Sequence, residues 1–375
     1  MKVMVVWKAL GVGGYQLKLQ EIAREPDIEL IGVAPASWRE PGGSGSFEPL
    51  HLDGYQMIVS PVRLNGHFHF FFFPQLGQLL DEHRPDILHV EEEPYNLATF
   101  LAVREARKRG IPSIFFTWQN LARRYPPPFS WIEKHVHRQS QWAIAGTESA
   151  ASILRQKGYA GPISVIPQVG VDPETYHSTT RARSPEAPLS IGFGGRLVPE
   201  KGVAVLIEAC ARLTHDFRLT ILGDGPTGPE LRRLAEQRQI ADRVEFRSVP
   251  SGQMPEQLQK LDVLVLPSLS RPNWTEQFGR ILMYAMSCGV PVIGSTCGEI
   301  PSVIGDAGLI FPEGDVAGLT SHLERLADDT TLRRELGERG RERVLDRFTS
   351  QRVAEATVAV YRALAPASSP KTAGP

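Results

Sequence analysis

The sequence predicts an α/β protein with two parallel-sheet domains, and three observations lead to this fold class. The chain has 375 residues, more than one typical hydrophobic core uses, so two domains are expected. Short apolar segments alternate with amphipathic ones from the first residue, which is typical of parallel strands connected by helices. The alternation stops at residues 169–188, which are rich in Pro, Ser, Thr and Arg, and then begins again. We therefore predict domains over residues 1–170 and 187–349, joined by a linker over 169–188.

Each predicted strand is a short run of apolar and β-branched residues bounded by turn or polar residues. In the first domain these are KVMVVW (2–7), IELIGV (28–33), YQMIVS (55–60), DILHV (86–90), SIFFTW (113–118), WAIAG (142–146) and ISVIP (163–167). In the second they are LSIGFGG (189–195), FRLTILG (217–223), RVEFRS (243–248), DVLVLPS (262–268), PVIGS (291–295) and GLIF (308–311). Two such sheets, joined once, are expected to enclose a cleft at the carboxyl ends of their strands.

The last part of the sequence predicts a helix followed by a tail. Residues 341–365 have a strong helical pattern, and we expect a helix over about 350–366 to pack back on the first domain. The polar residues 367–375 are predicted to be disordered.

Composition excludes several classes of protein. The 41 Lys and Arg residues balance 42 Asp and Glu residues, so no basic field suggests a nucleic-acid partner. There is no apolar run of the length that a membrane span needs, and the apolar part of the first segment is too short for a signal peptide. Cys210, Cys288 and Cys297 lack CxxC spacing and are expected to be small buried residues in a reducing compartment. We expect a cytoplasmic protein.

Two loops of the second predicted domain suit a phosphate ligand. In IGFGGRLVPEKG a strand runs into Gly195, which lets a ligand approach the backbone, and Arg196 and Lys201 follow on the same loop. Two cations on one loop match a diphosphate, and equally match a solvated surface loop. In TILGDGP a second strand ends in a glycine-rich turn at Gly223, which alone predicts only a tight turn.

The stretch NWTEQFGRILMYAMSCGVPVIGS, residues 273–295, predicts a loop, a helix and a buried strand in succession. Glu276 opens the helical pattern, so Phe278 and Gly279 are expected in the first turn, where free N–H groups favour an anion. The amides can then hold a phosphate while the carboxylate binds hydroxyl groups. The alternative is that Glu276 only caps its own helix.

The first predicted domain has glycine and acidic residues at strand ends. Gly13 and Gly14 follow the first strand in LGVGGYQ, either as a simple turn or as a place where a ligand approaches. LHVEEEPYNL places Glu91, Glu92 and Glu93 after the fourth strand, either as a solvated face or facing the cleft.

An aromatic stretch, NGHFHFFFFPQ, carries two His residues. On a strand His67 and His69 would share a face, but metal binding needs a third ligand and none is suggested, so we predict no metal there. The aromatic residues 68–73 are core residues or a platform for a ligand, because sugars stack on aromatic rings and lipid tails lie on them. With residues 126–129 and Trp131 they can also form an apolar rim that contacts a membrane surface.

Together these motifs resemble the retaining glycosyltransferases of family 4, which have the GT-B architecture of two Rossmann-like domains facing each other across a cleft. The matching pieces are GGRLVPEKG, LGDGP, PSLSRPNWTEQFGRILMYAMSCGVPVIGS and GEIPSVIGDAGLIFPEGD, in the family's order and spacing. The resemblance implies an enzyme that moves a sugar from a nucleotide sugar to an acceptor hydroxyl with retention at the anomeric carbon. It says little about the acceptor, which we leave open between a saccharide, a lipid-linked saccharide and a small metabolite.

The resemblance also implies roles for the second domain. Arg196 and Lys201 occupy the positions that grip the donor diphosphate, and Glu276 matches the first Glu of the family's Glu, seven residues, Glu pattern, which faces the sugar hydroxyls. The other donor-binding positions are Gly14 of the first domain and, in the second, Gly195, Gly223, Val249 as the base contact, Gln277, Phe278, Gly279 and Tyr284. No Asp-x-Asp pair is found, so we expect no metal and no cofactor.

In the first domain the resemblance implies acceptor-side roles for Gly13, Glu91, Glu92, Glu93, Gln119 and His69. Gln119 stands where many relatives have a His, and since Gln cannot act as a base we expect it to position a polar group.

One position departs from the family pattern. Tyr284 occupies the place of the second Glu, which holds the ribose in relatives, so Tyr284 either replaces that contact or is buried packing. Two other functions stay open beside the transferase. They are a non-hydrolysing sugar-nucleotide epimerase, which shares the architecture, and a catalytically silent protein that holds a nucleotide sugar.

Overall fold

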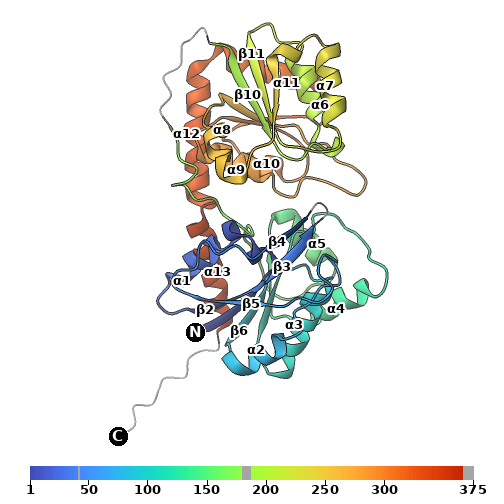
Figure 1. The fold of residues 1–375 in the computed structure, drawn as a ribbon, viewed down its shortest axis with the longest axis vertical. Coiled ribbons are helices and arrows are strands. Elements are labelled where there is room, and N and C mark those ends of the chain that lie inside the picture. Colours follow the sequence, from blue (N-terminus) through green and yellow to red (C-terminus); the bar gives the residue numbers. More distant parts are fainter. Residues whose placement is uncertain (41–42, 180–186, 366–375) are drawn as a thin grey trace. The chain divides into compact units, whose positions relative to one another are not determined.

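A computed structural model describes residues 1–40, 43–179 and 187–365 and divides the chain into two compact units (Figure 1). Unit 1 comprises Met1–Gly170 together with the chain from Ser350 onward, and unit 2 comprises Val171–Thr349. The chain therefore passes from unit 1 into unit 2 and back again. The predicted tail, residues 367–375, lies outside the described residues.

Unit 1 is built on a parallel sheet whose strands, among the described residues, run in the order β5-β2-β1-β6-β7-β8-β9. The strands are β1 Lys2–Val6, β2 Glu29–Pro35, β5 Gln56–Ser60, β6 Ile87–Val90, β7 Ser113–Thr117, β8 Trp142–Ala145 and β9 Ile163–Val165. The helices are α1 Leu17–Ala23, α2 Leu76–His83, α3 Leu97–Lys108, α4 Phe129–Gln139, α5 Glu148–Gln156 and α13 Ser350–Leu364. Short 3₁₀ turns follow β1, at Lys8–Gly11 and Gly13–Tyr15. All strands predicted for the first domain are confirmed.

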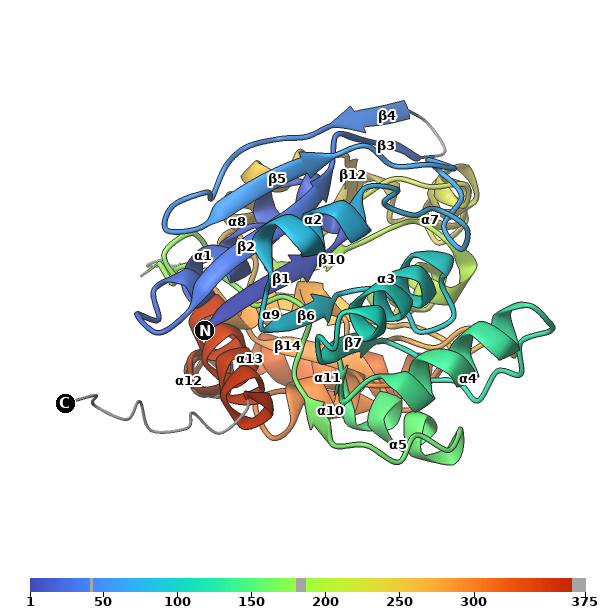
Figure 2. The same cartoon turned by 90° about the horizontal axis from the view of Figure 1, so that it is seen from below.

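The alternation of side chains along β1 shows how the sheet of unit 1 is covered on both faces. Val3 and Val5 pack with Leu19 of α1 and with Val358 and Tyr361 of α13. The intervening residues, Met4 and Val6, belong to a second cluster with residues of α2 and α3. Successive residues of a strand point to opposite faces, so a continuous apolar run is what a doubly covered strand requires. Figure 2 shows α13 beside α1, and α2 and α3 with the strands of unit 1.

Unit 2 repeats the plan with a parallel sheet, in the described chain, of order β12-β11-β10-β13-β14-β15. Its strands are β10 Leu189–Gly194, β11 Phe217–Leu222, β12 Val244–Arg247, β13 Val263–Leu266, β14 Val292–Ser295 and β15 Leu309–Phe311. Its helices are α6 Val203–Cys210, α7 Gly228–Gln237, α8 Met254–Leu258, α9 Arg280–Ser287, α10 Ile300–Ile304, α11 Val316–Asp328 and α12 Thr330–Arg347. The 3₁₀ turns are Pro199–Lys201, Ala241–Arg243 and Ser251–Gln253. The strands predicted for the second domain are confirmed, and the three cysteines are buried as expected.

Several parts of the fold differ from the sequence prediction. A small antiparallel hairpin, β3 Ser37–Glu40 and β4 Gly43–Ser46, was not predicted because its Gly and Ser residues give no apolar alternation. The helical stretch 341–365 is two helices, α12 and α13, which break at Phe348 and Thr349. Residues 171–179 of the predicted linker belong to unit 2, where Val171 is buried. The next part of that linker, residues 180–186, lies outside the described residues.

None of the helices in the described chain has the length and apolar character that a membrane span needs.

Candidate functional site

The strand orders of both sheets identify where each unit is expected to bind a ligand. In unit 1 the order reverses between β1 and β6, because the chain goes from β1 to β2 on one side and later returns to β6 on the other. In unit 2 the reversal lies between β10 and β13. In doubly wound sheets ligands bind beyond the carboxyl ends of the strands at such a switch point. The segments that follow β1, β6, β10 and β13 are therefore the candidate binding segments.

In unit 2, two of the predicted glycine loops are in direct contact. Gly195 follows β10, and its N–H donates to Leu222 O at the end of β11 at 2.9 Å. A Cβ atom on Gly223 would lie 1.9 Å from Gly195 O, and Gly223 has a φ of +151°. Only glycine fits this close approach, so the two loops meet beside the switch point because neither carries a side chain there.

Lys201 and Glu276, both predicted as catalytic residues, form an ion pair at the switch point of unit 2. Lys201 Nζ lies 2.5 Å from Glu276 Oε2, although the residues are 75 positions apart in the sequence. Ser268, which follows β13 by two residues, donates its Oγ hydrogen to the same oxygen at 2.8 Å. The Lys201 ammonium also lies 5.3 Å from the centroid of the Trp274 ring. Ser268 and Trp274 were not predicted, because nothing in their local sequence marks them as partners of this pair.

The helix after Glu276 begins later than predicted. Helix α9 starts at Arg280, and Gly279 is its N-cap with a φ of +76°, a left-handed conformation that suits glycine. Phe278 and Gly279 therefore precede the helix and do not lie in its first turn. Glu276 lies three residues before the N-cap, and its buried carboxylate is held by Lys201 and Ser268. This arrangement favours the site interpretation of Glu276 over the capping one.

The other predicted donor residues differ in exposure. Arg196 lies on the same loop as Lys201 with an exposed side chain, and Gln277 is exposed next to Glu276. Phe278 is buried, and its ring meets that of Phe348 edge to face with centroids 5.6 Å apart. Val249 lies in the loop after β12 and is partly buried.

Tyr284 stacks on Tyr176 from the segment that enters unit 2. The ring centroids are 4.5 Å apart and the planes are 12° from parallel. Burial raises the pKa of the Tyr176 phenol above its ordinary value. The stacking favours the packing interpretation of Tyr284, and a contact with the ribose stays a prediction.

In unit 1, two of the three successive glutamates are buried in ion pairs, so the solvated-face interpretation is wrong. Lys18 of α1 pairs with Glu91, and both are almost completely buried, at 2% and 1% exposure. Lys8 binds Glu92 twice, from its backbone N–H at 2.9 Å and from Nζ at 2.8 Å. Lys8 follows β1 and Glu92 follows β6, so this pair marks the switch point of unit 1. Neither lysine was predicted, because each partner lies more than 70 positions away in the chain.

Glu93 makes a different set of contacts. It accepts hydrogen bonds from Trp118 N and Thr117 Oγ1, each at 2.8 Å, and so joins the ends of β6 and β7. Burial raises the pKa of Glu93 to about 7, although both hydrogen bonds favour the ionised carboxylate. This carboxyl therefore titrates near neutral pH.

Helix α13 is tied to β6 by a buried hydrogen bond. His89 Nδ1 lies 2.8 Å from the hydroxyl of Tyr361, and His89 Nε2 lies 3.5 Å from Glu91 Oε1. Burial lowers the pKa of His89 to about 4, so its ring is neutral at neutral pH. Helix α13, which follows unit 2 in the sequence, thus contacts His89, and His89 in turn lies beside Glu91 of the Lys18–Glu91 ion pair.

Gln119 is fixed by two charged residues that were not predicted. Lys157 Nζ donates to Gln119 Oε1 at 2.5 Å and to Glu133 Oε1 at 2.7 Å. Gln119 Nε2 in turn donates to Glu133 Oε1 at 3.0 Å. A Gln held at both ends of its amide suits the predicted positioning role.

The aromatic stretch after residue 66 is a turn and not a strand. The N–H groups of Phe70 and Phe71 both donate to His67 O, so His67 and His69 do not share a strand face. Phe71 and Phe73 are buried in the core of unit 1, whereas Phe68 and Phe70 are exposed. The described residues contain no group of three or more His, Cys, Asp or Glu side chains that could hold a metal ion.

The glycine loop after β1 is covered at one residue and open at the next. A Cβ atom on Gly13 would meet Leu50 at 2.6 Å, and the N–H of Gly13 donates to Glu48 Oε2 at 3.2 Å. Gly14 is exposed, and a Cβ atom there would have no atom of the described chain within 4 Å. A ligand can therefore approach the backbone of this loop at Gly14.

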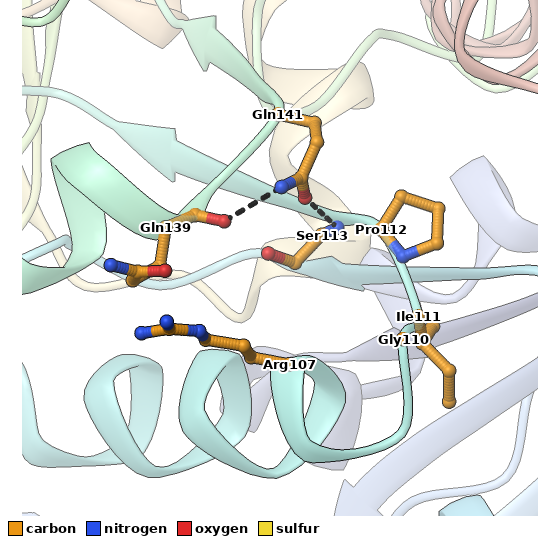
Figure 3. Close-up of a pocket in the computed structure, with 7 residues that line it drawn as sticks. All are labelled: Arg107, Gly110, Ile111, Pro112, Ser113, Gln139 and Gln141. Atoms are coloured by element: carbon orange, nitrogen blue, oxygen red, sulfur yellow. Dashed lines mark hydrogen bonds between the residues drawn. The ribbon is translucent and has the colours of Figure 1, made fainter.

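A surface pocket lies at the opposite end of the strands of unit 1 from the switch point, at the amino ends of β7 and β8 (Figure 3). Gln141 closes one side of it, because its Oε1 accepts from Ser113 N at 2.8 Å and its Nε2 donates to Gln139 O at 2.9 Å. The lining residues are Arg107, Gly110, Ile111, Pro112, Ser113, Gln139 and Gln141. None of the predicted site residues is among them, so this pocket is separate from both switch points.

Two family profiles match most of the chain between them. The profile described as Glycosyltransferase Family 4 matches residues 27–175, and the profile described as Glycosyl transferases group 1 matches residues 179–343. Their border falls close to the first crossing between the units, at residues 170 and 171.

Curated relatives are similar over parts of the chain. The N-acetyl-alpha-D-glucosaminyl L-malate synthase of Bacillus anthracis is 34% identical over 165 residues, which are 43% of this chain and 42% of that protein. The putative colanic acid biosynthesis glycosyltransferase WcaL of Escherichia coli is 32% identical over 62% of this chain and 59% of its own length. The D-inositol 3-phosphate glycosyltransferase of Stackebrandtia nassauensis is 29% identical over 76% of this chain and 71% of its own. The matched region thus spans about half the length of the first two relatives.

Solved structures share the fold over nearly the whole chain. HepE of Anabaena in complex with UDP superposes with a TM-score of 0.74 at 17% identity, over 97% of this chain and 100% of that one. The sucrose-phosphate synthase of Thermosynechococcus elongatus gives 0.70 at 18% identity, over 97% and 99%. The predicted GT-B architecture of two Rossmann-like units is confirmed.

Proposed function

The chain belongs to the glycosyl transferases of group 1 and family 4, and from this premise we propose that it is a retaining glycosyltransferase. It takes a sugar from a nucleotide sugar and transfers it to an acceptor hydroxyl, without a metal ion. The relative HepE has been solved with UDP-glucose as well as with UDP, which makes a uridine nucleotide the first donor to test.

The observation that carries this proposal is the group of Lys201, Glu276 and Ser268 at the switch point of unit 2. A nucleotide diphosphate needs cations, and Lys201 lies there with the exposed Arg196 on the same loop. The transferred sugar needs hydrogen-bond acceptors for its hydroxyls, and Glu276 supplies a carboxylate beside the lysine. Both groups of the donor therefore find suitable partners within one loop cluster.

These residues suit the chemistry of sugar transfer. As the bond from the anomeric carbon to the diphosphate breaks, negative charge develops on the leaving oxygen, and Lys201 and Arg196 stabilise it. The leaving diphosphate takes the proton of the acceptor hydroxyl. Glu276 holds Lys201 in place before the donor arrives, so little reorganisation is needed at the moment of reaction.

Unit 1 holds the acceptor in this proposal. Glu93, Gln119 and His69 supply polar groups near the ends of β6 and β7, and Gly14 leaves the backbone after β1 open to the donor. Glu91 and Glu92 do not contact the acceptor themselves, because their carboxylates are paired with Lys18 and Lys8; they hold these lysines in place.

The test compares Arg196→Ala and Lys201→Ala with Arg212→Ala, an exposed arginine at the end of α6. We expect both site variants to lose about 2–4 kcal/mol of transition-state stabilisation with UDP-glucose, and the control to lose none. UDP at 100 times its dissociation constant should stabilise the wild type by about 2.7 kcal/mol in a thermal-shift assay.

The two site variants should differ in stability. Lys201→Ala leaves the buried carboxylate of Glu276 without its cation and lowers the melting temperature, whereas Arg196→Ala removes an exposed side chain and does not. Full turnover in both folded variants contradicts the diphosphate assignment. Product analysis identifies the class of reaction, since a new glycoside supports transfer and an epimerised donor contradicts it.

A further inference from the structure

We propose that the acceptor is a neutral saccharide whose pyranose ring stacks on Phe68 and Phe70 at the rim of unit 1. This inference rests on the proposed function, because it names the class of acceptor for the same site. It follows from the contacts of three successive residues, Phe68, His69 and Phe70.

Phe68 lies at the switch point of unit 1. Its ring centroid is 3.9 Å from Nζ of Lys8, the lysine that follows β1 and pairs with Glu92 after β6. The ring is 45% exposed although it packs on the ammonium. An aromatic ring beyond the carboxyl ends of two central strands is placed where a doubly wound unit binds its ligand.

Phe70 and His69 extend this aromatic surface. The ring of Phe70, 41% exposed, lies 5.2 Å from that of Phe129 at the start of α4. The imidazole of His69 lies 5.1 Å from Phe68, 5.5 Å from Phe129 and 5.5 Å from Tyr95. These ring contacts fix the two exposed Phe rings, so a ligand that stacks on them meets a surface that is already ordered.

Polar groups are interleaved with the exposed rings. His69 Nδ1 donates to Oδ1 of the buried Asn96 at 3.2 Å, which holds the imidazole beside Phe68. The ammonium of Lys8 lies over the same ring, where the buried carboxylate of Glu92 holds it. A pyranose matches this pattern, because it has an apolar C–H face for the ring and hydroxyl groups at its edge for the polar partners.

The same interleaving disfavours the other acceptor classes. An acyl chain laid on Phe68 would remove water from the Lys8 ammonium and the His69 imidazole without giving them hydrogen bonds, which costs free energy. An anionic acceptor would compete with Glu92 for the ammonium of Lys8, which that carboxylate already holds. A neutral molecule with hydroxyl groups meets neither obstacle.

The experiment measures saccharide binding to the full chain with UDP present. A panel of methyl pyranosides is tested by saturation-transfer-difference NMR and as acceptors for UDP-glucose, with wild type, Phe68→Ala and Phe68→Trp. Trp131→Ala is the matched control, because Trp131 is an exposed aromatic residue of α4, 66% exposed. Vesicles of phosphatidylglycerol and phosphatidylcholine test the lipid alternative.

We expect at least one pyranoside to give signals from its ring C–H protons. Phe68→Ala should raise its KM at least tenfold at unchanged UDP affinity, Phe68→Trp should restore it, and Trp131→Ala should change neither. Equal saccharide binding by wild type and Phe68→Ala overturns the inference, as does vesicle binding that depends on Phe68 while no pyranoside binds. If no nucleotide sugar supports any transfer, the proposed function itself fails. If UDP-glucose supports transfer to an acceptor that is not a pyranoside, only the acceptor class is wrong.

Discussion

Glu93 has a partly buried side chain that, among the described residues, has no ion-pair partner, unlike its neighbours Glu91 and Glu92. Burial raises the pKa of Glu93, and the hydrogen bonds from Trp118 N and Thr117 Oγ1 lower it by a smaller amount. The net result is a pKa of about 7. A carboxyl whose pKa is higher in the folded chain than in the unfolded chain binds its proton more tightly in the fold. Its favourable contribution is therefore present below pH 4.5, the unfolded value, and is lost as the pH rises through 7.

The loss of this stabilising contribution with rising pH predicts the effect of Glu93→Gln. The neutral amide can accept from Trp118 N and donate to Thr117 Oγ1, so the variant should gain stability over wild type as the pH rises. The gain should be small near pH 5 and reach about 3 kcal/mol near pH 8, because each tenfold difference in proton affinity between the folded and unfolded chains corresponds to about 1.4 kcal/mol. Urea unfolding of both proteins at the two pH values measures it, with Glu82→Gln, an exposed carboxyl, as the control. A stability difference that does not change with pH would contradict the raised pKa.

At the residue scale the sequence predicts which positions lie at strand ends but not which side chains pair. Arg196, Lys201 and Glu276 follow from motif spacing, because each motif is local. The partners of Glu91, Glu92 and Gln119 lie on other elements, and only the folded topology brings them together. Glu91 and Glu92 are an example. A run of three acidic residues in a loop is usually solvated, but here two of the three are buried by partners that the local sequence does not reveal.

Whole strands are predicted more reliably than side-chain partners. A strand covered on both faces must be apolar throughout, so the central strands of the two large sheets are visible as short apolar runs, whereas the edge strand β12 is visible by alternation of apolar and polar residues. The start of α9 is less visible, because Phe278 continues the apolar pattern while the left-handed Gly279 delays the helix to Arg280. The hairpin β3–β4 lies outside both large sheets and is not covered on both faces. Its sequence therefore needs no apolar run, and no pattern in it predicts a strand.

The contact between the loops after β10 and β11 makes a prediction at this scale. Gly223→Ala places a Cβ atom 1.9 Å from Gly195 O, so one of the two loops must move. We expect a loss of several kcal/mol in the stability of unit 2, together with weaker UDP binding, because the loop of Gly195, which carries Arg196 and Lys201, loses its close contact with the loop of Gly223. Gly252→Ala is the matched control in the same unit, since a Cβ atom there has no atom of the described chain within 4 Å. Calorimetry with and without UDP gives both quantities, and similar melting of the two variants would show that the loops are not in contact.

For the molecule as a whole, unit 1 is completed by the helix that follows unit 2 in the sequence. Val353, Ala354, Val358, Val360 and Tyr361 of α13 are part of the same hydrophobic cluster as β1 and α1. Both profiles and both sets of strands can be recognised in order along the sequence. The expected packing of the C-terminal helix on the first domain is confirmed, but its individual partners, such as Val3 and Leu19, lie more than 300 positions earlier and could not be named from local periodicity.

Ending the chain at Thr349 should therefore unfold unit 1 and leave unit 2 intact. Each large buried side chain that is lost costs about 2–5 kcal/mol, and several together exceed the roughly 5–15 kcal/mol that stabilise a domain. A calorimetric scan should lose one transition, and UDP should still raise the temperature of the other. A chain that ends at Ala365 keeps all of α13 and should show both transitions. Two transitions in the shorter chain would show that α13 is dispensable for unit 1.

The two crossings between the units have a consequence for how the family can diversify. Val171 N donates to Phe348 O at 2.9 Å, and Val171 pairs with Thr349 in a parallel bridge, so the polypeptide enters and leaves unit 2 at neighbouring points. Unit 2 is therefore an insertion in the sequence of unit 1, and its first and last residues, Val171 and Thr349, pair with each other. From the proposed division of roles, in which unit 2 binds the donor and unit 1 the acceptor, we expect residues 171–349 to be exchangeable as a single block with those of a relative of another sugar specificity. In such a chimera donor choice should follow the insert and acceptor choice should follow the host.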